Sequence, residues 1–589
     1  MANNSSEISL FCLLSGIDSA IKVTVAKNSH VSDLELLFLR RVSNTLPGVD
    51  DHALSFWMLN NPIPLEEERE FVNIAPKDIA QIAVELKGTR HISTYFPSQP
   101  AIEYLHIVVI APQNARKRKR ALSPSPSPSL EDETAHRLKR LALLPRMAAS
   151  TLAEPSVFEA QDWENHLFDF NRPSQPGGVP VTLLHPVFGQ FVDDASNTTL
   201  TSEDYDFAWV LRKEMSGYFP WGSERAEVFR ELLWDSIDIP LEDTSSRGTD
   251  GHYHVKGYCV VETEAHGEIG GRGVEPYLLN GIRYAHFVRT LGDQIGGSVL
   301  PCLTVFHAGK CPFIGFAGAA FTDVVRQDML TAVHSFIWEP HDELSATQVA
   351  RVLRAFRNAV ECLKQYYTQE LPTIQELDPS EWPNTRYPYP FKYRPISASG
   401  DAAYVKFSYT DVIENKLIFK GRSVGKDEII IKFTRRYSKE VHLWCAEHGY
   451  APNLRGFEQL PGGWLMIVMD VVDASYTGLY LAQAILRHGQ AQCVRNKVEE
   501  LVRSLHTAGY VHGDLRGTNL LVAPQENGDV DVKLVDYDWA GIAGEVQYPP
   551  LINRESVHRA AGAVSGNAIV KEHDVDMVTF MFQDHLLQG

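Results

Sequence analysis

The chain has 589 residues, of which 44% are hydrophobic and 22% charged, and its formal net charge is −19. That length is too great for one hydrophobic core and predicts three or four domains, while the composition is typical of folded, soluble protein. No apolar run reaches the roughly 18 residues of a membrane span, so no membrane partner is expected. The seven cysteines form no C-x-x-C pair, which argues for a reducing compartment and against a disulfide framework or a zinc site.

The first 110 residues alternate between strand and helix patterns. The opening MANNSSEISLFCLLSGIDSA has no positively charged n-region, so a cleavable signal peptide is not expected. ISLFCLLSG and AIKVTVAK alternate apolar and polar residues, as the two strands of a half-buried hairpin would. VSDLELLFLRRV then predicts a helix, with Ser32 as its cap and Glu35 three residues on. Its apolar face comprises Leu34, Leu37, Phe38 and Val42.

Three further strands complete this segment. They are predicted at Ala53–Leu59, Gln81–Leu86 and Tyr104–Ile110. A hairpin, a helix and then more strands within about 110 residues predict a small α+β roll of ubiquitin type over residues 1–112. The order alone is also that of a generic ubiquitin-like interaction module.

Particular motifs narrow this interpretation. The opening LFCLLSG, the extended HISTYFPSQPAIEYLHIVVIAP and the abrupt change of composition after Pro112 resemble the N-terminal domain of Crinkler effectors over roughly residues 7–112. Oomycete members carry a signal peptide and an LFLAK-like translocation motif. Neither is evident in this sequence, which fits the fungal members better.

Residues 113–150 are predicted to be a disordered linker. Residues 114–147 hold nine Lys and Arg against three Asp and Glu, a net charge of +6 that leaves −25 for the rest of the chain. The SPSPSPS repeat cannot continue a helix and has no apolar surface to bury, so a mobile segment is expected. The basic clusters at 116–120 and 137–140 fit nuclear import, or simply a solvated basic linker. Phosphorylation of the serines that precede prolines would lower the local positive charge.

Residues 151–385 predict a second globular domain. Helices are expected at EDYDFAWVLRKEM, SERAEVFRELLWDSI and EPYLLNGIRYAHFVRTL, and strands at YHVKGYCVVETEA, LPCLTVFHAG and PFIGFAGAAF. Their order, with helix, strands, helix and strand in succession, resembles a restriction-endonuclease-like α/β core. In that fold an aspartate and a glutamate on adjacent strands hold Mg²⁺, and a lysine two residues beyond the glutamate helps to activate water.

Asp250 and Glu264 have the residue types and the spacing of such a metal site. The segment ETEAHGEIG resembles a nuclease-like segment found in Crinkler C-termini, which also keeps Glu268 in place. His266, however, stands at the lysine position, and a histidine that is largely neutral at pH 7 does not replace a fixed ammonium charge. Lys256 is the substitute that the sequence offers. A scaffold without cleavage activity remains the alternative.

Residues 390–589 carry motifs that resemble a protein kinase. DEIIIKF predicts a buried strand with Lys432 inside its apolar run, and burying an ammonium group is costly unless an anion awaits it. This is the position of the lysine that contacts the α- and β-phosphates of ATP in the kinase fold. Ser438 is predicted to cap the following helix. Glu440 is the expected ion-pair partner of Lys432, with Glu447 as its rival.

The catalytic loop resembles the kinase pattern in spacing. In YVHGDLRGTNLLV, four residues separate Asp514 from Asn519. The resemblance implies that Asp514 receives the acceptor proton, Arg516 steadies the transferring phosphate and Asn519 holds a metal ion. Asp536, in VKLVDYDWAG, corresponds to the aspartate that binds Mg²⁺. The glycine of the His512-Gly513-Asp514 triplet occurs in kinase-like families that lack activation-loop control.

Three departures limit this resemblance. No G-x-G-x-x-G motif precedes Lys432, and no A-P-E motif follows Asp536. The chain ends about 50 residues after Asp536, which predicts a short C-terminal lobe, with Asp574 as the expected anchor of the catalytic loop. A pseudokinase that binds nucleotide without efficient transfer is therefore an alternative to an active enzyme.

The segments together resemble a fungal Crinkler effector: a multidomain α+β protein with a ubiquitin-like N-terminal domain, a restriction-endonuclease-like domain and a bilobal kinase-like domain. The resemblance implies an ATP- and Mg²⁺-dependent Ser/Thr kinase that is secreted and acts on a host protein, or near DNA, in the host nucleus. Two alternatives stay open. One is a DNA-cleaving toxin regulated by a nucleotide-binding pseudokinase, and the other is a pair of folds that only bind host proteins. An intracellular role in conflict or self-defence would leave the same sequence.

Overall fold

The structure is a computed structural model of the 589-residue chain. It describes residues 7–582 except 15–19, 35–37, 39–54, 66–78, 80–81, 88–89, 111–129, 160–165, 173–177, 245–248, 267–274, 309–312, 397–401, 414–415, 480–489, 555–556 and the single residues Ser32, Ile102, Glu526 and Gly528. The chain divides into two compact units. The first comprises Met1–Pro124, Arg436–Arg455 and Met469–Gly589, and the second comprises Ser125–Arg435 and Gly456–Val468.

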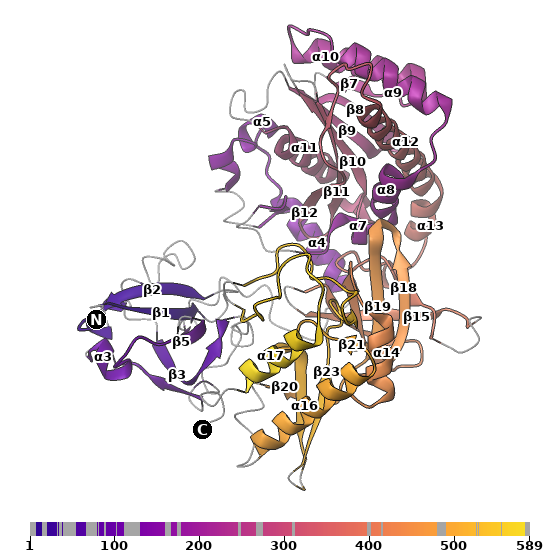
Figure 1. Ribbon diagram of the computed structural model, residues 1–589. Coiled ribbons are helices and arrows are strands. Elements are labelled where there is room, and N and C mark those ends of the chain that lie inside the picture. Colours follow the sequence, from indigo (N-terminus) through magenta and orange to yellow (C-terminus); the bar gives the residue numbers. More distant parts are fainter. Residues whose placement is uncertain are drawn as a thin grey trace. The chain divides into compact units, whose positions relative to one another are not determined.

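The N-terminal segment of the first unit is a five-stranded sheet. Its strands are β1 (Glu7–Leu14), β2 (Ile21–Ala26), β3 (Ser55–Pro64), β4 (Ala83–Glu85) and β5 (Tyr104–Ile110). They lie in the order β2-β1-β5-β3-β4, with β1 antiparallel to β2 and parallel to β5 (Figure 1). The short helix α3 (Ile92–Tyr95) follows β4. The predicted ubiquitin-type roll is confirmed.

The predicted helix after β2 is described in part. Val31, Asp33, Leu34 and Phe38 are helical, and Leu34 and Phe38 are buried in the core of the sheet, as predicted. The helix begins earlier than predicted, since Asp33 Oδ2 accepts a hydrogen bond from His30 N at 2.9 Å. The remaining predicted helix residues, namely Ser32, Glu35, Leu37 and Val42, lie outside the described side chains.

The predicted linker is wrong from Leu130 onward. Leu130–Leu143 form helix α4, and Ala149–Leu152 form α5. The Arg137 side chain is only 3% exposed, because its guanidinium donates to four backbone carbonyls of the second unit. Arg140 donates to Asp323 O at 2.9 Å. Two cations of the basic cluster at 137–140 are thus used inside the fold, while the cluster at 116–120 lies outside the described residues.

A long mixed sheet forms the centre of the second unit. Its strands lie in the order β6-β12-β11-β10-β9-β8-β7, and β13 pairs with β11. They are β6 (Phe168–Asp169), β7 (Glu242–Thr244), β8 (Thr249–Val255), β9 (Tyr258–His266), β10 (Cys302–Ala308), β11 (Phe313–Phe321), β12 (Val325–Met329) and β13 (His334–Ser335). β8 and β9 are a hairpin, and β10 is parallel to β9. The stretch predicted as one strand over YHVKGYCVVETEA therefore turns at Lys256 and Gly257, both of which have positive φ.

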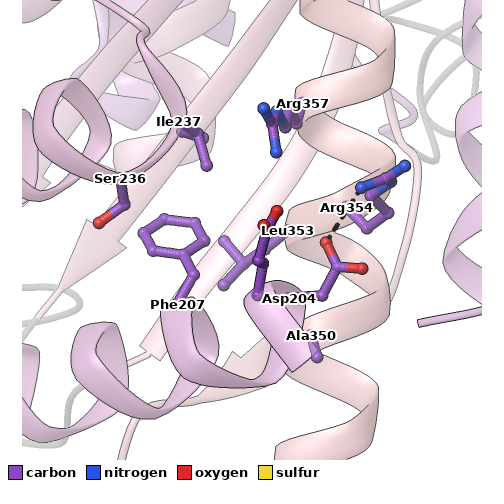
Figure 2. A pocket seen from close by; sticks show the side chains of 9 residues that line it. Asp204, Phe207, Ser236, Ile237, Ala350, Leu353, Arg354 and Arg357 are labelled. Atoms are coloured by element: carbon purple, nitrogen blue, oxygen red, sulfur yellow. Dashed lines mark hydrogen bonds and ion pairs between the residues drawn. The ribbon is translucent and has the colours of Figure 1, made fainter. Parts of the chain in front are cut away.

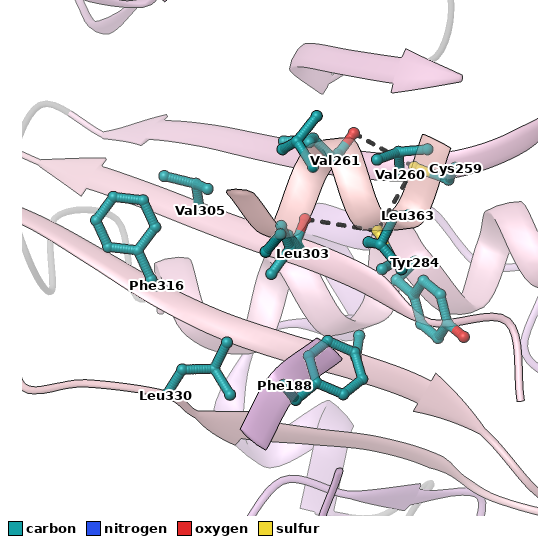
Figure 3. Close-up of a cluster of buried hydrophobic side chains, with 14 of the residues drawn as sticks. Phe188, Cys259, Val260, Val261, Tyr284, Leu303, Val305, Phe316, Leu330 and Leu363 are labelled. Carbon is teal, nitrogen blue, oxygen red and sulfur yellow. Dashed lines mark hydrogen bonds between the residues drawn. The ribbon is translucent and has the colours of Figure 1, made fainter. Parts of the chain in front are cut away.

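Helices cover both faces of this sheet. They are α7 (Val181–Leu184), α8 (Pro186–Asn197), α9 (Ser202–Met215), α10 (Gly222–Ile237), α11 (Pro276–Leu291), α12 (Glu343–Gln365) and α13 (Leu371–Gln375). Phe306 of β10 contacts Tyr277 of α11, whereas Phe316 of β11 contacts Phe191 of α8 and Phe356 of α12. The apolar runs predicted as strands are thus buried on two faces, and Figure 3 shows part of the resulting core.

A second sheet in this unit belongs to the predicted kinase-like segment. β14 (Lys392–Tyr393), β15 (Val405–Ile413), β16 (Ile418–Ser423), β17 (Glu428–Thr434), β19 (Trp464–Asp470) and β18 (Leu454–Leu460) lie in that order. Leu183 of α7 belongs to the same buried cluster as Phe419, Ile431 and Trp464 of this sheet. The domains predicted over 151–385 and 390–589 therefore share a core at this point.

Two hydrogen bonds join α7 and α8 to the turn between β18 and β19. Trp464 Nε1 donates to Thr182 Oγ1 at 2.9 Å, and Gly462 N donates to Asp193 Oδ2 at 2.8 Å. Gly189 of α8 packs directly against this turn, since a Cβ atom there would lie 2.6 Å from Pro461 O. The N-terminal kinase-like sheet is therefore fixed to the central domain.

The rest of the kinase-like segment lies in the first unit. It contains α14 (Lys439–Glu447), α16 (Gln490–Thr507), α17 (Lys571–Met581), the sheet of β20 (Thr477–Gly478), β22 (Leu520–Pro524) and β23 (Val530–Leu534), and the pair of β21 (Tyr510–Val511) and β24 (Gly541–Ile542). α14 and α16 pack on β22 and β23 around one buried cluster. Within the described residues, no helix is both long and apolar enough to cross a membrane.

Candidate functional site

The predicted catalytic loop follows directly after β21 and brings three predicted residues together. Asn519 Nδ2 donates to the backbone oxygen of Asp514 at 2.8 Å and lies 3.1 Å from its Oδ2. Arg516 Nε lies 3.2 Å from the same carboxylate. The Asp514 side chain sits in a buried position, only 6% exposed as a residue. A carboxylate, a cation and an amide thus converge within the span of six residues.

Asp574 of α17 ties this loop to the helix. Its two carboxylate oxygens accept hydrogen bonds from His512 N at 2.9 Å and Gly513 N at 2.8 Å. His506 Nε2 lies 3.1 Å from the same carboxylate. His512 is fully buried, and its Nε2 lies 3.2 Å from Val535 O, next to Asp536. The contact predicted for Asp574 with the catalytic loop is therefore present.

The glycine between His512 and Asp514 has a steric reason. Gly513 has φ of +80°, and a Cβ atom at this position would lie 2.8 Å from Ile569 Cδ1. Side chains rarely adopt that backbone conformation, and no Cβ atom fits there without displacement of Ile569. An arginine at this position would therefore need both a strained backbone and a shift of the Ile569 side chain.

Asp536 follows β23 in a left-handed backbone conformation, with φ of 71°. A non-glycine residue in this region is held there by its surroundings, and such residues cluster at functional sites. Val535 N donates to Asn519 O at 3.0 Å, which joins the two segments that carry the predicted metal ligands. The negative charge of Asp536 also acts on Asp514.

The residues present fit a kinase-type Mg²⁺ site. Among the described residues, no group of three or more His, Cys, Asp or Glu could hold a metal ion. A kinase site does not require one, because one carboxylate and one amide oxygen hold the ion together with the phosphates of the nucleotide. Asp536 and Asn519 would supply these oxygen ligands. The Asn519 Nδ2 atom donates to Asp514, so the amide Oδ1 points away from that carboxylate.

Lys432 and Glu440 are described in separate units. Lys432 lies on β17 and is 8% exposed. Glu440 is exposed on α14, and so is its rival Glu447. The buried face of α14 carries His442 instead, stacked on Tyr537 at 4.7 Å and bonded to the Tyr437 hydroxyl at 2.7 Å. The Lys432–Glu440 ion pair stays a prediction.

One residue of the site was missed by the sequence analysis. Arg559 Nη1 donates to Asp514 Oδ1 at 2.6 Å, and its guanidinium lies 4.8 Å from the centre of the Trp539 ring. Burial raises the pKa of Asp514, but Arg516 and Arg559 outweigh it and hold that pKa below its usual value. No motif marks Arg559, because only the return of the chain after β24 brings it to the loop.

The second predicted site lies on the hairpin of the central sheet. Gly251 lies opposite Thr263, so the next residues along, Asp250 and Glu264, are neighbours across β8 and β9. Arg283 of α11 forms an ion pair with Glu264, which is 1% exposed. Asp250 Oδ2 also accepts from Ala265 N at 2.7 Å. The predicted pair is brought together.

These contacts do not fit an open metal site. Burial raises the pKa of Glu264 well above its usual range, Asp250 adds to that rise, and Arg283 opposes it. The guanidinium takes the place beside Glu264 that a cation would need. Lys256 cannot assist, since it lies at the tip of the hairpin, six residues along β8 or about 20 Å from Asp250. His266 ends β9, but its side chain and the whole of Glu268 lie outside the described residues.

A separate small pocket lies between α9, α10 and α12. It has a volume of about 150 Å³ and is crossed by the ion pair of Arg354 with Asp204 at 3.3 Å (Figure 2). Phe207, Ile237 and Leu353 form its apolar wall. None of the residues predicted from the sequence lines it, so it belongs to neither predicted site.

Comparison with known proteins defines the class of the N-terminal segment. Residues 8–110 match the family model described as the Crinkler effector protein N-terminal domain. The predicted Crinkler resemblance is thus confirmed for this part of the chain. Crinkler effector protein 1 of Rhizophagus irregularis is 29% identical over 109 residues. The match covers 18% of this chain and 22% of that protein, so the chain spans about a fifth of its relative.

Solved structures that match the chain include three protein kinases. The Cydia pomonella Granulovirus kinase PK-1 has 16% identity, a TM-score of 0.23 and coverage of 29% of this chain and 65% of its own. Vaccinia related kinase 3 has 14% identity, a TM-score of 0.23 and coverage of 32% and 65%. The Rad53 kinase domain with SCD2 in complex with AMPPNP has 20% identity, a TM-score of 0.18 and coverage of 23% and 51%. The chain spans less than two thirds of each of these structures.

Proposed function

We propose that the protein is a Crinkler-type effector whose C-terminal region is an ATP- and Mg²⁺-dependent Ser/Thr protein kinase. The observation that carries this proposal is the convergence of Asp514, Arg516 and Asn519, with Asp574 holding the loop by two backbone amides. Burying a carboxylate costs free energy. The fold nevertheless buries two around this loop, those of Asp514 and Asp574, and buried ionisable groups of this kind are typical of functional sites.

Each residue has a defined part in the proposed transfer. Asp514 orients the acceptor hydroxyl and takes its proton, and Arg516 faces the developing charge of the transferring group. Lys432 contacts the phosphates of the nucleotide, with Glu440 as its proposed ion-pair partner. Asn519 and Asp536 would hold Mg²⁺, and the ion would neutralise the charge of the phosphate groups.

The test is single-turnover transfer from radiolabelled ATP with Mg²⁺, using the full chain and Asp514→Asn beside it. We expect label on the chain or on a generic acceptor from the wild type and none from the variant. Asp576→Asn is the matched control, since Asp576 is exposed on α17 and, among the described residues, its polar partner is His558 rather than the loop. Equal labelling by the wild type and Asp514→Asn would reject the kinase proposal. Protection against heat by ATP without any transfer would favour a pseudokinase.

A DNA-cleaving toxin regulated by a pseudokinase is the second candidate. The adjacency of Asp250 and Glu264 on β8 and β9 favours this candidate. The element order also favours it, because α10, the strands β7 to β9, α11 and β10 follow one another in an order that resembles a restriction-endonuclease-like core. The Arg283 ion pair opposes it. Under the kinase proposal, Lys432→Ala and Asp536→Ala abolish toxicity and Asp250→Ala leaves it intact. The opposite pattern would support cleavage of DNA.

Delivery and location form the outer part of the proposal. The match of the N-terminal domain to Crinkler effectors supports delivery into a host cell. The further step in this proposal is action on a protein in the host nucleus, with import through the basic cluster at 116–120. An intracellular site of action is the alternative. If toxicity survives every one of these active-site variants, the two folds act only as binding surfaces for host proteins. Microscopy of the tagged full chain with residues 116–120 changed to alanine tests the import step.

A further inference from the structure

Both carboxylate oxygens of Asp514 are occupied by groups of the chain itself. Arg559 Nη1 donates to Oδ1 at 2.6 Å. On the other side, Asn519 Nδ2 lies 3.1 Å from Oδ2. The oxygen of a general base must come within about 2.6–3.2 Å of the oxygen whose proton it removes. Arg516 Nε also lies 3.2 Å from Oδ2, so that oxygen already has two donors of the chain. Oδ1, which is held by Arg559, is therefore the oxygen for which an acceptor hydroxyl must compete.

We propose that Arg559 blocks the acceptor site by occupying the place of the acceptor hydroxyl, so that its guanidinium must leave Asp514 before transfer. This inference rests on the proposed kinase function. Arg516 is the cation that the loop itself supplies and stays with Asp514 throughout. Arg559 is contributed from outside the loop, 45 positions further along the chain, so it can withdraw without changing the loop.

The position of Arg559 is stabilised by three kinds of contact. Its side chain is 3% exposed, its guanidinium stacks over Trp539, and its Nε donates to Asn553 O at 3.4 Å. Ala560, the next residue, and Ala563, four residues beyond Arg559, belong to a small buried cluster with Val511 and Ile569. That cluster is much smaller than the main core of the lobe, so these contacts hold Arg559 in place without fixing it permanently.

The same contacts define the class of acceptor. A guanidinium that leaves Asp514 without another anion stays unpaired in a buried position, and this is costly. An acceptor with an acidic group beside its hydroxyl supplies that anion, because Arg binds carboxylate and phosphate groups through paired hydrogen bonds. Acidic Ser/Thr segments are therefore the acceptors that the site selects.

The experiment uses the full chain with Arg559→Gln, and Arg554→Gln as the matched control. Arg554 is exposed on the same segment and donates to Ala563 O at 2.8 Å without contacting Asp514. Transfer is measured to two synthetic peptides in which a serine is flanked by glutamates or by glutamines. A water-soluble carbodiimide with an amine, followed by mass spectrometry, measures access to Asp514 independently of transfer. Arg559→Lys is the second variant should the melting curve of Arg559→Gln show loss of the fold.

We expect Arg559→Gln to label faster at Asp514 and to transfer about tenfold faster to the glutamine peptide, the size expected for removal of one charged hydrogen bond. The preference of the wild type for the glutamate peptide should shrink in the variant, and Arg554→Gln should match the wild type. Slower transfer by Arg559→Gln would make Arg559 a positioning residue and overturn the inference while the kinase proposal stands. Faster carbodiimide labelling of Asp514 in Arg559→Gln, with no phosphoryl transfer by the wild type or by either variant, would overturn the proposed function and this inference together.

Discussion

Asp574 Oδ1 accepts a hydrogen bond from Gly513 N at 2.8 Å, across a sequence separation of 61. The other oxygen of the same carboxylate accepts from His512 N. One buried side chain therefore satisfies two successive amides of the loop that carries Asp514. Because buried amides without partners are costly, this contact fixes the backbone of the loop before any ligand binds.

Asp574→Asn should weaken both the fold and the transfer reaction. An asparagine has one carbonyl oxygen, so one of the two buried amides loses its acceptor and faces an NH₂ group. We expect a loss of about 1–3 kcal/mol in the free energy of unfolding and at least a tenfold lower transfer rate. Denaturant unfolding and the radiolabel assay measure the two effects. Asp576→Asn, on the exposed side of the same helix, should change neither, and a similar loss there would remove the special role of Asp574.

Gly513→Ala should destabilise the protein more than Gly509→Ala. Both residues have left-handed φ, of +80° and +88°, so both variants carry the same backbone penalty of about 1 kcal/mol. Only at Gly513 does the new Cβ atom meet Ile569, whereas nothing lies within 4 Å of it at Gly509. We expect a further loss of about 1–3 kcal/mol from this contact. Equal losses by thermal unfolding would show that the glycine of the triplet serves only the backbone conformation.

Gly189→Ala should reverse the usual sign of a helix substitution. Replacing a glycine within a helix by alanine normally raises the free energy of unfolding by about 0.5–1 kcal/mol. In α8, however, the new Cβ atom would lie 2.6 Å from Pro461 O, against the turn that carries the N-terminal kinase-like sheet. We expect a net loss of about 1–3 kcal/mol and faster proteolysis of that sheet. Ser196→Ala on the exposed face of α8 is the control, and a stabilised Gly189→Ala protein would show that the contact is absent in solution.

The N-terminal domain should lose stability in mild acid because of His106. Its Nδ1 accepts from Phe11 N at 3.0 Å and its Nε2 donates to Ala101 O at 2.9 Å, which holds the ring neutral. Burial lowers the pKa of His106 to about 4, although the bond to Ala101 opposes this. The unfolded chain takes up a proton below its ordinary pKa of about 6.5, and the folded chain does not, so stability falls as pH drops from 6.5 toward 4.

At pH 5 this effect should amount to about 2 kcal/mol for the N-terminal domain. Hydrogen exchange of the β5 amides, corrected for the intrinsic rate at each pH, measures it in the full chain. His106→Asn should be less stable at neutral pH but should lose most of the additional decline between pH 7 and pH 5. His30→Asn, at an exposed histidine of the same domain, should keep the decline, and its disappearance there would assign the effect elsewhere.

The local elements followed from the sequence where the pattern and the burial agree. Several elements lie where periodicity predicts them, because each buries one face or one continuous apolar run. They are the N-terminal roll with β5, the helices α9, α10 and α11, and the strands β10, β11 and β17. The prediction failed for Leu130–Leu143 because Arg and Lys residues signal a solvated segment in sequence. The pattern cannot show that Arg137 meets four backbone carbonyls of two distant segments, 296–298 and 321–322.

At the candidate site, the sequence by itself determined the residues that lie close together along the chain. Asp514, Arg516 and Asn519 share one loop, and their types and order define the chemistry that they can perform. Only the tertiary structure decided what surrounds them, because contacts across 45 or 61 positions leave no trace in local pattern. It added Arg559 to Asp514 and gave Gly513 its steric reason. In the central domain it set Arg283 against Glu264. Burial makes such long-range partners obligatory, and the fold alone determines which residues they are.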